Sequence, residues 1–165
     1  MDLEKLSIIN TFLVVMWIMG PAYIASSVAV LTGGKFPIDQ GRKLEDGNRI
    51  LGDGKTWSGL IGGTLGGIVF GLILNTDAGY SALESLTDEK FSRELWGENP
   101  LFVFTILSFG SLFGDMSASF YKRRQNLDRG DKFALLDMYD FIFMTLFLCL
   151  IFQKTWLTSW ILDGW

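Results

Sequence analysis

Histidine is absent from this 165-residue chain, and cysteine occurs once, as Cys149 inside an apolar run. Without histidine the chain lacks the commonest metal ligand and the commonest general base of proteins. A single cysteine excludes a disulfide within the chain. Any chemistry must therefore rest on carboxylates, on lysine and arginine, on hydroxyl groups and on bound cations.

Charge is also scarce. Charged residues make up 19% of the chain, against about 25% in an average soluble domain. They are clustered, which leaves long apolar stretches between them. The net charge of −4 argues against a nucleic-acid-binding protein, which normally has a basic surface. We therefore predict an all-α integral membrane protein, a bundle of four to five transmembrane helices in a single domain, residues 1–165.

Four apolar stretches are long enough to cross a bilayer, which needs about 20 residues of helix. Gly20 and Pro21 interrupt the first stretch and predict a kink, because proline removes a backbone donor. The tail, residues 154–165, is too short to cross and is rich in tryptophan, which favours the membrane interface. The predicted spans are residues 6–31, 57–74, 100–120 and 133–152.

The segments between these spans alternate in charge. Residues 32–56 and 121–132 are rich in lysine and arginine, whereas residues 75–99 are mainly acidic. Basic loops stay on the cytoplasmic side of a membrane. We therefore predict a multi-pass protein of the cell membrane, with the first and third loops in the cytoplasm.

The second predicted span contains a row of glycines at every fourth position, Gly59, Gly63, Gly67 and Gly71. This spacing places them on one face of a helix. In a membrane, such a face allows the backbone of another helix to approach closely. We expect this span to lie at the centre of the bundle.

Residues 51–57, Leu-Gly-Asp-Gly-Lys-Thr-Trp, lead into the second span. A P-loop would need glycine at position 49, where this chain has Arg49, so that motif is rejected. A glycine-rich turn before a helix still offers free N–H groups to a phosphate, and Lys55 adds a positive charge. An ordinary capped helix start would have the same pattern.

A second polar group lies near the cytoplasmic end of the third span. Asp115 is about five residues, or roughly 7 Å, inside this end. An ionisable group at such a depth is costly and indicates function. Ser119 lies one turn further on the same face. The basic residues Lys122, Arg123 and Arg124 follow; alone, such a triplet more often marks topology than a site.

A third polar group opens the fourth span. Asp137 and Asp140 are three residues apart and share one helix face, and capping would account for only one of them. Because a short loop joins spans three and four, we expect Asp115 to lie near both. Three carboxylates repel one another unless they hold cations, and oxygen ligands suit Mg²⁺. Carboxylates, a metal and nearby cations are what nucleotidyl transfer requires.

Several short motifs in this chain resemble those of the archaeal CDP-archaeol synthases. The later motifs are also similar to the CDP-diacylglycerol synthases. The resemblance covers about residues 20–145. It rests on Pro21-Ala22-Tyr23, Pro37-Ile38-Asp39, Gly41-Arg42, residues 51–57, Gly114-Asp115, Ser119, residues 122–124, Gly130, Leu136-Asp137 and Asp140.

The resemblance implies that the chain transfers CMP from CTP to an isoprenoid ether lipid phosphate, 2,3-bis-O-(geranylgeranyl)-sn-glycerol 1-phosphate, with Mg²⁺ as cofactor. It implies metal binding by Asp115, Asp137 and Asp140. It implies phosphate contacts from Lys55, Lys122, Arg123 and Arg124. Asp53 and Ser119 would orient the substrates, and Gly54 and Thr56 complete the implied CTP-binding set.

Two features bear on this interpretation. The lipid phosphate is already anionic at neutral pH, so the transfer needs no general base, in agreement with the missing histidine. Related chains usually continue through a fifth span, whereas this one ends at Trp165. The tail is therefore expected to be a truncated fifth span or to lie along the membrane.

Three other classes of protein are alternatives to this interpretation. A CDP-alcohol phosphotransferase would need an Asp-Gly-x-x-Ala-Arg motif, which the chain lacks. A cation transporter or channel could use the buried aspartates, but would spread them through the depth of the membrane. An inactive structural relative is a third alternative. The sequence leaves open the saturation of the lipid chains, the choice of CTP or dCTP, and whether a homodimer forms.

Overall fold

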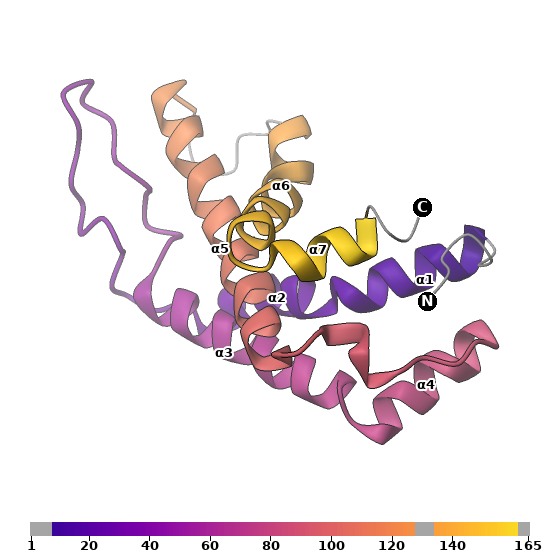
Figure 1. Cartoon of the computed structure of the whole chain (residues 1–165). Coiled ribbons are helices and arrows are strands. Elements are labelled where there is room, and N and C mark those ends of the chain that lie inside the picture. The colour runs from indigo at the N-terminus through magenta and orange to yellow at the C-terminus, as the bar shows by residue number, and fades with distance from the viewer. Residues whose placement is uncertain (1–7, 128–133, 162–165) are drawn as a thin grey trace.

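The computed structural model describes residues 8–127 and 134–161 and confirms the predicted all-helical fold (Figure 1). Within these ranges, extended backbone pairs only at two isolated bridges, both in the segment 33–56. The helices are α1 (Ile8–Ile18), α2 (Gly20–Thr32), α3 (Trp57–Leu74), α4 (Asp77–Thr87), the 3-10 helix η2 (Arg93–Trp96), α5 (Pro100–Arg124), α6 (Ala134–Phe152) and α7 (Lys154–Ile161).

The predicted spans coincide with the long helices. Among the described residues, α3 and α5 are each long and apolar enough to cross a bilayer, and α1 with α2 makes a third candidate as a bent pair. The described part of α6, Tyr139–Phe152, is apolar but shorter. The fourth span, and the placement of α7 in the membrane interface, stay predictions.

The predicted kink in the first span is confirmed. The helix breaks at Met19, and the axes of α1 and α2 differ in direction by 47°. Pro21 lies in the first turn of α2, where its missing N–H costs no helical hydrogen bond.

The glycine row on α3 brings three helices together. Gly59, Gly63, Gly67 and Gly71 are all buried. A Cβ atom at Gly63 would lie 2.7 Å from the carbonyl oxygen of Ala25 on α2 and 2.9 Å from the Leu112 side chain on α5. Any larger residue would therefore force these helices apart, as the spacing predicted.

The acidic segment 75–99 forms more structure than its composition indicated. Thr76 caps α4 by accepting a hydrogen bond from the Gly79 N–H at 3.2 Å. Leu83 and Trp96 are fully buried. The Trp156 side chain of α7 donates to the Leu95 carbonyl at 3.0 Å. We call this group, residues 75–99 with α7, the apolar lobe.

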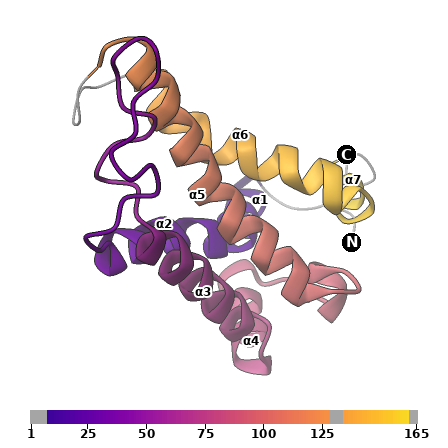
Figure 2. The same cartoon turned by 90° about the vertical axis from the view of Figure 1, so that its left-hand side faces the viewer.

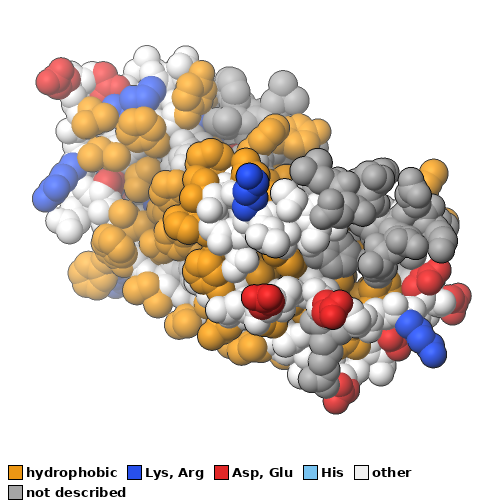
Figure 3. All heavy atoms as spheres, viewed as in Figure 1, with side chains coloured by type: hydrophobic (Ala, Val, Ile, Leu, Met, Phe, Trp, Pro, Cys, Tyr) orange, Lys and Arg blue, Asp and Glu red, His pale blue; other side chains and the backbone are white. Residues whose placement is uncertain are grey.

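The two ends of the molecule differ in character. The segment 33–56 rises beside the C-terminal end of α5, and α4 lies at the opposite end of the molecule (Figures 1 and 2). On the face drawn in Figure 3, hydrophobic side chains cover much of the left and middle, and charged side chains lie at the left edge, at the lower right and in a few places between. Many large hydrophobic side chains of the helices are exposed, which suits a chain whose middle lies in lipid.

Candidate functional site

Lys55 and Asp115 form an ion pair across 60 residues of sequence. Lys55 immediately precedes the cap of α3, and Asp115 lies on α5 near its polar end. The Lys55 side chain is 20% exposed and the Asp115 side chain 50% exposed. Two residues predicted for one site are therefore in direct contact, at a point that solvent can reach.

A small cavity opens beside this pair. Its volume is about 90 Å³, and residues from α2, α3 and α5 line it. Gly54, Lys55 and Asp115 are among its polar lining, while Val30 and Leu112 are among its apolar lining. A cavity with this lining can hold a charged group close to an apolar one.

Gly114 brings α6 against α5 next to Asp115. A Cβ atom at Gly114 would lie 2.8 Å from the Cα atom of Phe141 and would also meet the Asp140 carbonyl oxygen. The Asp140 carboxylate accepts a hydrogen bond from the Phe141 N–H at 2.6 Å. The two helices therefore touch at the level where the sequence predicted facing aspartates.

The predicted metal site is described only in part. Asp137 lies in the first turn of α6, but its side chain is outside the described residues. Among the side chains that the structure describes, no three Asp, Glu, Cys or His come together to hold a metal. Metal binding by Asp115, Asp137 and Asp140 stays a prediction.

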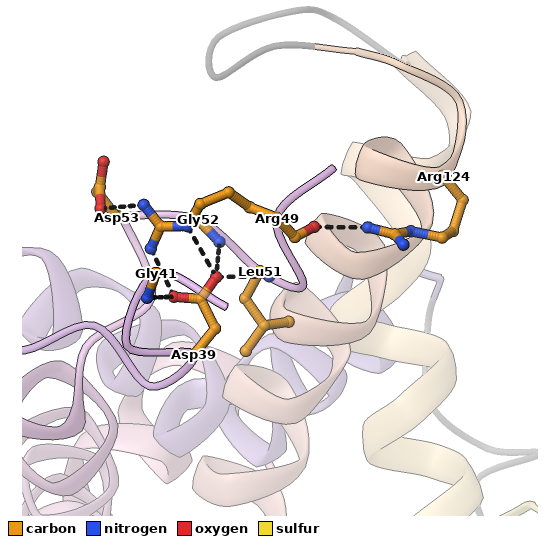
Figure 4. A network of polar contacts seen from close by, with 7 residues as sticks. All are labelled: Asp39, Gly41, Arg49, Leu51, Gly52, Asp53 and Arg124. Carbon is orange, nitrogen blue, oxygen red and sulfur yellow. Dashed lines mark hydrogen bonds and ion pairs between the residues drawn. The ribbon is translucent and has the colours of Figure 1, made fainter. Parts of the chain in front are cut away.

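Asp39 organises the segment that carries Lys55 (Figure 4). Its side chain has no exposed surface. Arg49 donates to it from two nitrogens, at 2.5 and 3.1 Å. The backbone N–H groups of Gly41, Leu51 and Gly52 donate at 3.1, 3.0 and 2.9 Å. We call the ion pair and these three backbone bonds the Asp39 clasp.

Electrostatics stabilise both charged partners of the Asp39 clasp. The Arg49 guanidinium and the backbone N–H groups hold the pKa of Asp39 well below its usual range, although burial opposes this shift. The carboxylates of Asp39 and Asp53 raise the pKa of Arg49 above its ordinary value. Both groups are therefore charged at neutral pH.

Asp53 and Arg124 extend this network. Asp53 accepts a hydrogen bond from Arg49 at 2.6 Å and is largely exposed. Arg124, at the end of α5, pairs with Asp46 at 2.9 Å and donates to the Arg49 carbonyl oxygen at 2.5 Å. In this structure Arg124 thus holds the segment 33–56 against α5.

Thr56 and Arg123 have local partners. The buried hydroxyl oxygen of Thr56 caps α3 by accepting from the Gly59 N–H at 3.1 Å, and it also accepts from the Gly34 N–H at 3.2 Å. Arg123 donates to the Leu127 carbonyl oxygen, and its guanidinium lies against Gly52. A substrate contact by Thr56 or Arg123 stays a prediction.

Ser119 and Lys122 are half-buried on the last two turns of α5, beyond Asp115. Their predicted roles are not tested by the contacts described. By contrast, no role was predicted for Asp39 or Arg49 from the sequence. The sequence Asp39-x-Gly41 does indicate a turn, because an aspartate side chain that accepts from the N–H two residues later is typical of one.

The fold and these residues define a helical membrane protein with a charged cluster at one end of its bundle. Residues 8–162 match the CarS-like family, described as CDP-archaeol synthase. The CDP-archaeol synthase of Methanospirillum hungatei is 42% identical over 86% of this chain and 79% of its own length. That of Archaeoglobus fulgidus is 38% identical over 90% of this chain and 79% of its own length.

A solved structure is also similar. It concerns an intramembrane enzyme for archaeal membrane lipids biosynthesis. Its TM-score with this chain is 0.64 at 34% identity, over 83% of this chain and 76% of that one. The chain belongs to the CDP-archaeol synthase family. This membership favours an enzyme over the cation transporter that the aspartates alone allowed.

Proposed function

We propose that this chain transfers CMP from CTP to 2,3-bis-O-(geranylgeranyl)-sn-glycerol 1-phosphate, in archaeal membrane phospholipid biosynthesis. The observation that carries this proposal is the match of residues 8–162 to the family. The products are CDP-archaeol and pyrophosphate. The Lys55–Asp115 ion pair beside the cavity supports our proposal that the reaction takes place there.

The reaction needs charge compensation more than proton transfer. A phosphate oxygen of the lipid forms a bond to the α-phosphorus of CTP. The bond from that phosphorus to the bridging oxygen breaks, and pyrophosphate leaves with the electron pair. Lys55, Lys122 and Arg123 would offset the negative charge that gathers in the transition state. An anionic nucleophile needs no general base, which agrees with a chain that has no histidine.

The three aspartates proposed for the site are chemically suited to a magnesium ion. Asp115, Asp137 and Asp140 would hold it, because carboxylate oxygens are the ligands that Mg²⁺ prefers. When bound, the ion would supply positive charge next to the triphosphate. The contact of Gly114 with the Asp140 backbone supports this assignment, since it brings the helices of Asp115 and Asp140 together.

We place the reaction on the cytoplasmic side of the cell membrane. The segment 33–56 and the end of α5 are rich in lysine and arginine and lie at the same end of the molecule (Figure 2). Basic segments next to membrane helices favour the cytoplasmic side. All the residues named for the site come from one chain, so the proposal does not depend on a homodimer.

The test is an assay with purified protein in detergent, labelled CTP, Mg²⁺ and the ether lipid phosphate. We expect a labelled CDP-lipid from the wild type, and a loss of about 100-fold or more in Asp140→Asn and Asp137→Asn. The matched control is Asp88→Asn, an exposed aspartate of the apolar lobe, which should keep full activity.

The outcomes separate two failures. If the wild type forms no CDP-lipid, the proposed reaction is wrong. If the wild type is active and both variants transfer at the same rate as it does, the metal-ligand assignment is wrong and the reaction stands.

A further inference from the structure

The Asp39 clasp controls the backbone on both sides of Lys55. The Ile38 N–H, next to Asp39, donates to the Lys55 carbonyl oxygen at 2.8 Å. The Lys55 N–H donates to the Gly52 carbonyl oxygen at 3.3 Å. Gly52 is itself held by Asp39 through its N–H. Both backbone polar groups of Lys55 are therefore bonded to residues next to or within the clasp.

The clasp also meets the cationic end of α5. Gly52 has a φ of +99°, a backbone conformation that disfavours any side chain there. A Cβ atom at Gly52 would lie 3.4 Å from Nε of Arg123. The Arg49 carbonyl accepts from Arg124 on the same helix end. The clasp therefore sets the segment against α5 as well as setting Lys55.

The contacts of Asp39 order the segment 33–56 as a whole. The segment 33–56 contains no helix, and its bridges are isolated. Its order depends on polar contacts, and the Asp39 side chain that accepts several of them has no exposed surface. Arg49 and Asp39 pair through two nitrogens and two oxygens, a geometry that fixes direction as well as distance.

We propose that Asp39 and Arg49 are positioning residues of the transfer reaction. Their ion pair holds Lys55 against Asp115 and holds the Gly52 backbone against Arg123, and it acts through these cations without touching the substrates. The inference rests on the proposed function, because it assigns Lys55 a part in the reaction. Asp39 is buried under its own partners, so a direct contact with CTP is not part of the proposal.

The test is a double-mutant cycle on the purified full chain, with kcat measured per folded protein. Asp39→Asn keeps the shape of the side chain and removes its charge. We expect kcat to fall about 10- to 100-fold, as misplaced catalytic groups do. In a Lys55→Arg background, Asp39→Asn should lower kcat further by less than about twofold, because the two residues act as one unit.

The matched control is Glu45→Gln, which removes an exposed carboxylate from the same segment and should leave kcat unchanged. A purely structural role predicts the same fold-loss from Asp39→Asn in both backgrounds, and this result would overturn the proposal. So would a wild-type kcat in Asp39→Asn. An inactive wild type would instead refute the proposed function.

A second variant covers the case in which Asp39→Asn does not fold. Arg49→Lys keeps the positive charge beside Asp39 but loses the paired geometry of the guanidinium. We expect a folded protein whose kcat is lower by about 3- to 10-fold, again with little further loss in the Lys55→Arg background. An unchanged kcat in Arg49→Lys would overturn the proposal.

Discussion

The segment 33–56 connects α2 to α3, and residues 75–99 of the apolar lobe connect α3 to α5. Both connections are rich in polar residues, yet different interactions stabilise them. In the segment 33–56, one charged side chain, Asp39, is buried and pairs with Arg49. In the apolar lobe, Leu83 and Trp96 point inward, while Asp88 and Glu98 are exposed.

Different kinds of side chain hold the two ends together. Burial of apolar surface needs no particular direction and tolerates charges placed outside it. Ion pairs and hydrogen bonds fix direction, which a site for a charged substrate needs. The same substitution of a charged residue should therefore matter at one end and not at the other.

The largest expected effect is on the stability of the apolar lobe. Trp96→Ala removes a fully buried side chain that stacks edge-on against Phe104, with ring centroids 4.8 Å apart. We expect the free energy of unfolding to fall by about 3–5 kcal/mol. Thermal unfolding in detergent measures this change. Leu86→Ala, at an exposed position of α4, is the control and should change stability by less than about 0.5 kcal/mol.

The next largest effect is on catalytic activity. Lys55→Gln should lower CDP-lipid formation by about 100- to 1,000-fold, the usual cost of removing one group that stabilises transition-state charge. Lys90→Gln removes an exposed lysine from the apolar lobe and should leave the rate unchanged. Equal losses in the two variants would show that the two ends do not differ in this way.

The smallest effect is on how the stability of the folded chain depends on pH. The pKa of Asp39 is lower in the folded chain than its usual value of 3.8. Its contribution to stability is therefore complete above pH 3.8 and is lost as the pH falls below that value toward the folded pKa. We expect the stability difference between the wild type and Asp39→Asn to stay constant from pH 5 to pH 8. A difference that shrank between pH 7 and pH 5 would contradict the lowered pKa.

Much of the helical framework could be predicted from local patterns. The span 57–74 matches α3 because an apolar run follows the capping residue Thr56. The break at Met19 follows from Pro21. By contrast, α4 was missed, since its apolar residues are few and its stability comes from packing. Propensity alone does not decide such short helices.

The candidate site was predicted as a set of residue types rather than as a set of contacts. Lys55 and Asp115 were assigned to one site, and the structure pairs them. Thr56 was assigned to CTP, and the structure shows it capping α3. Asp39 was not assigned to the site, because the spacing of Asp39 and Arg49 in the sequence does not predict that they form a buried ion pair.

From the sequence alone one can predict where the long helices lie, where the chain bends and which segments carry charge, because hydropathy, proline and helix caps act over a few neighbouring residues. Which charges meet depends on the three-dimensional packing of the chain. The distance between Lys55 and Asp115, or between Arg124 and Asp46, depends on how α2, α3 and α5 pack through their glycines and small residues. That packing is a property of the whole bundle and not of any one segment.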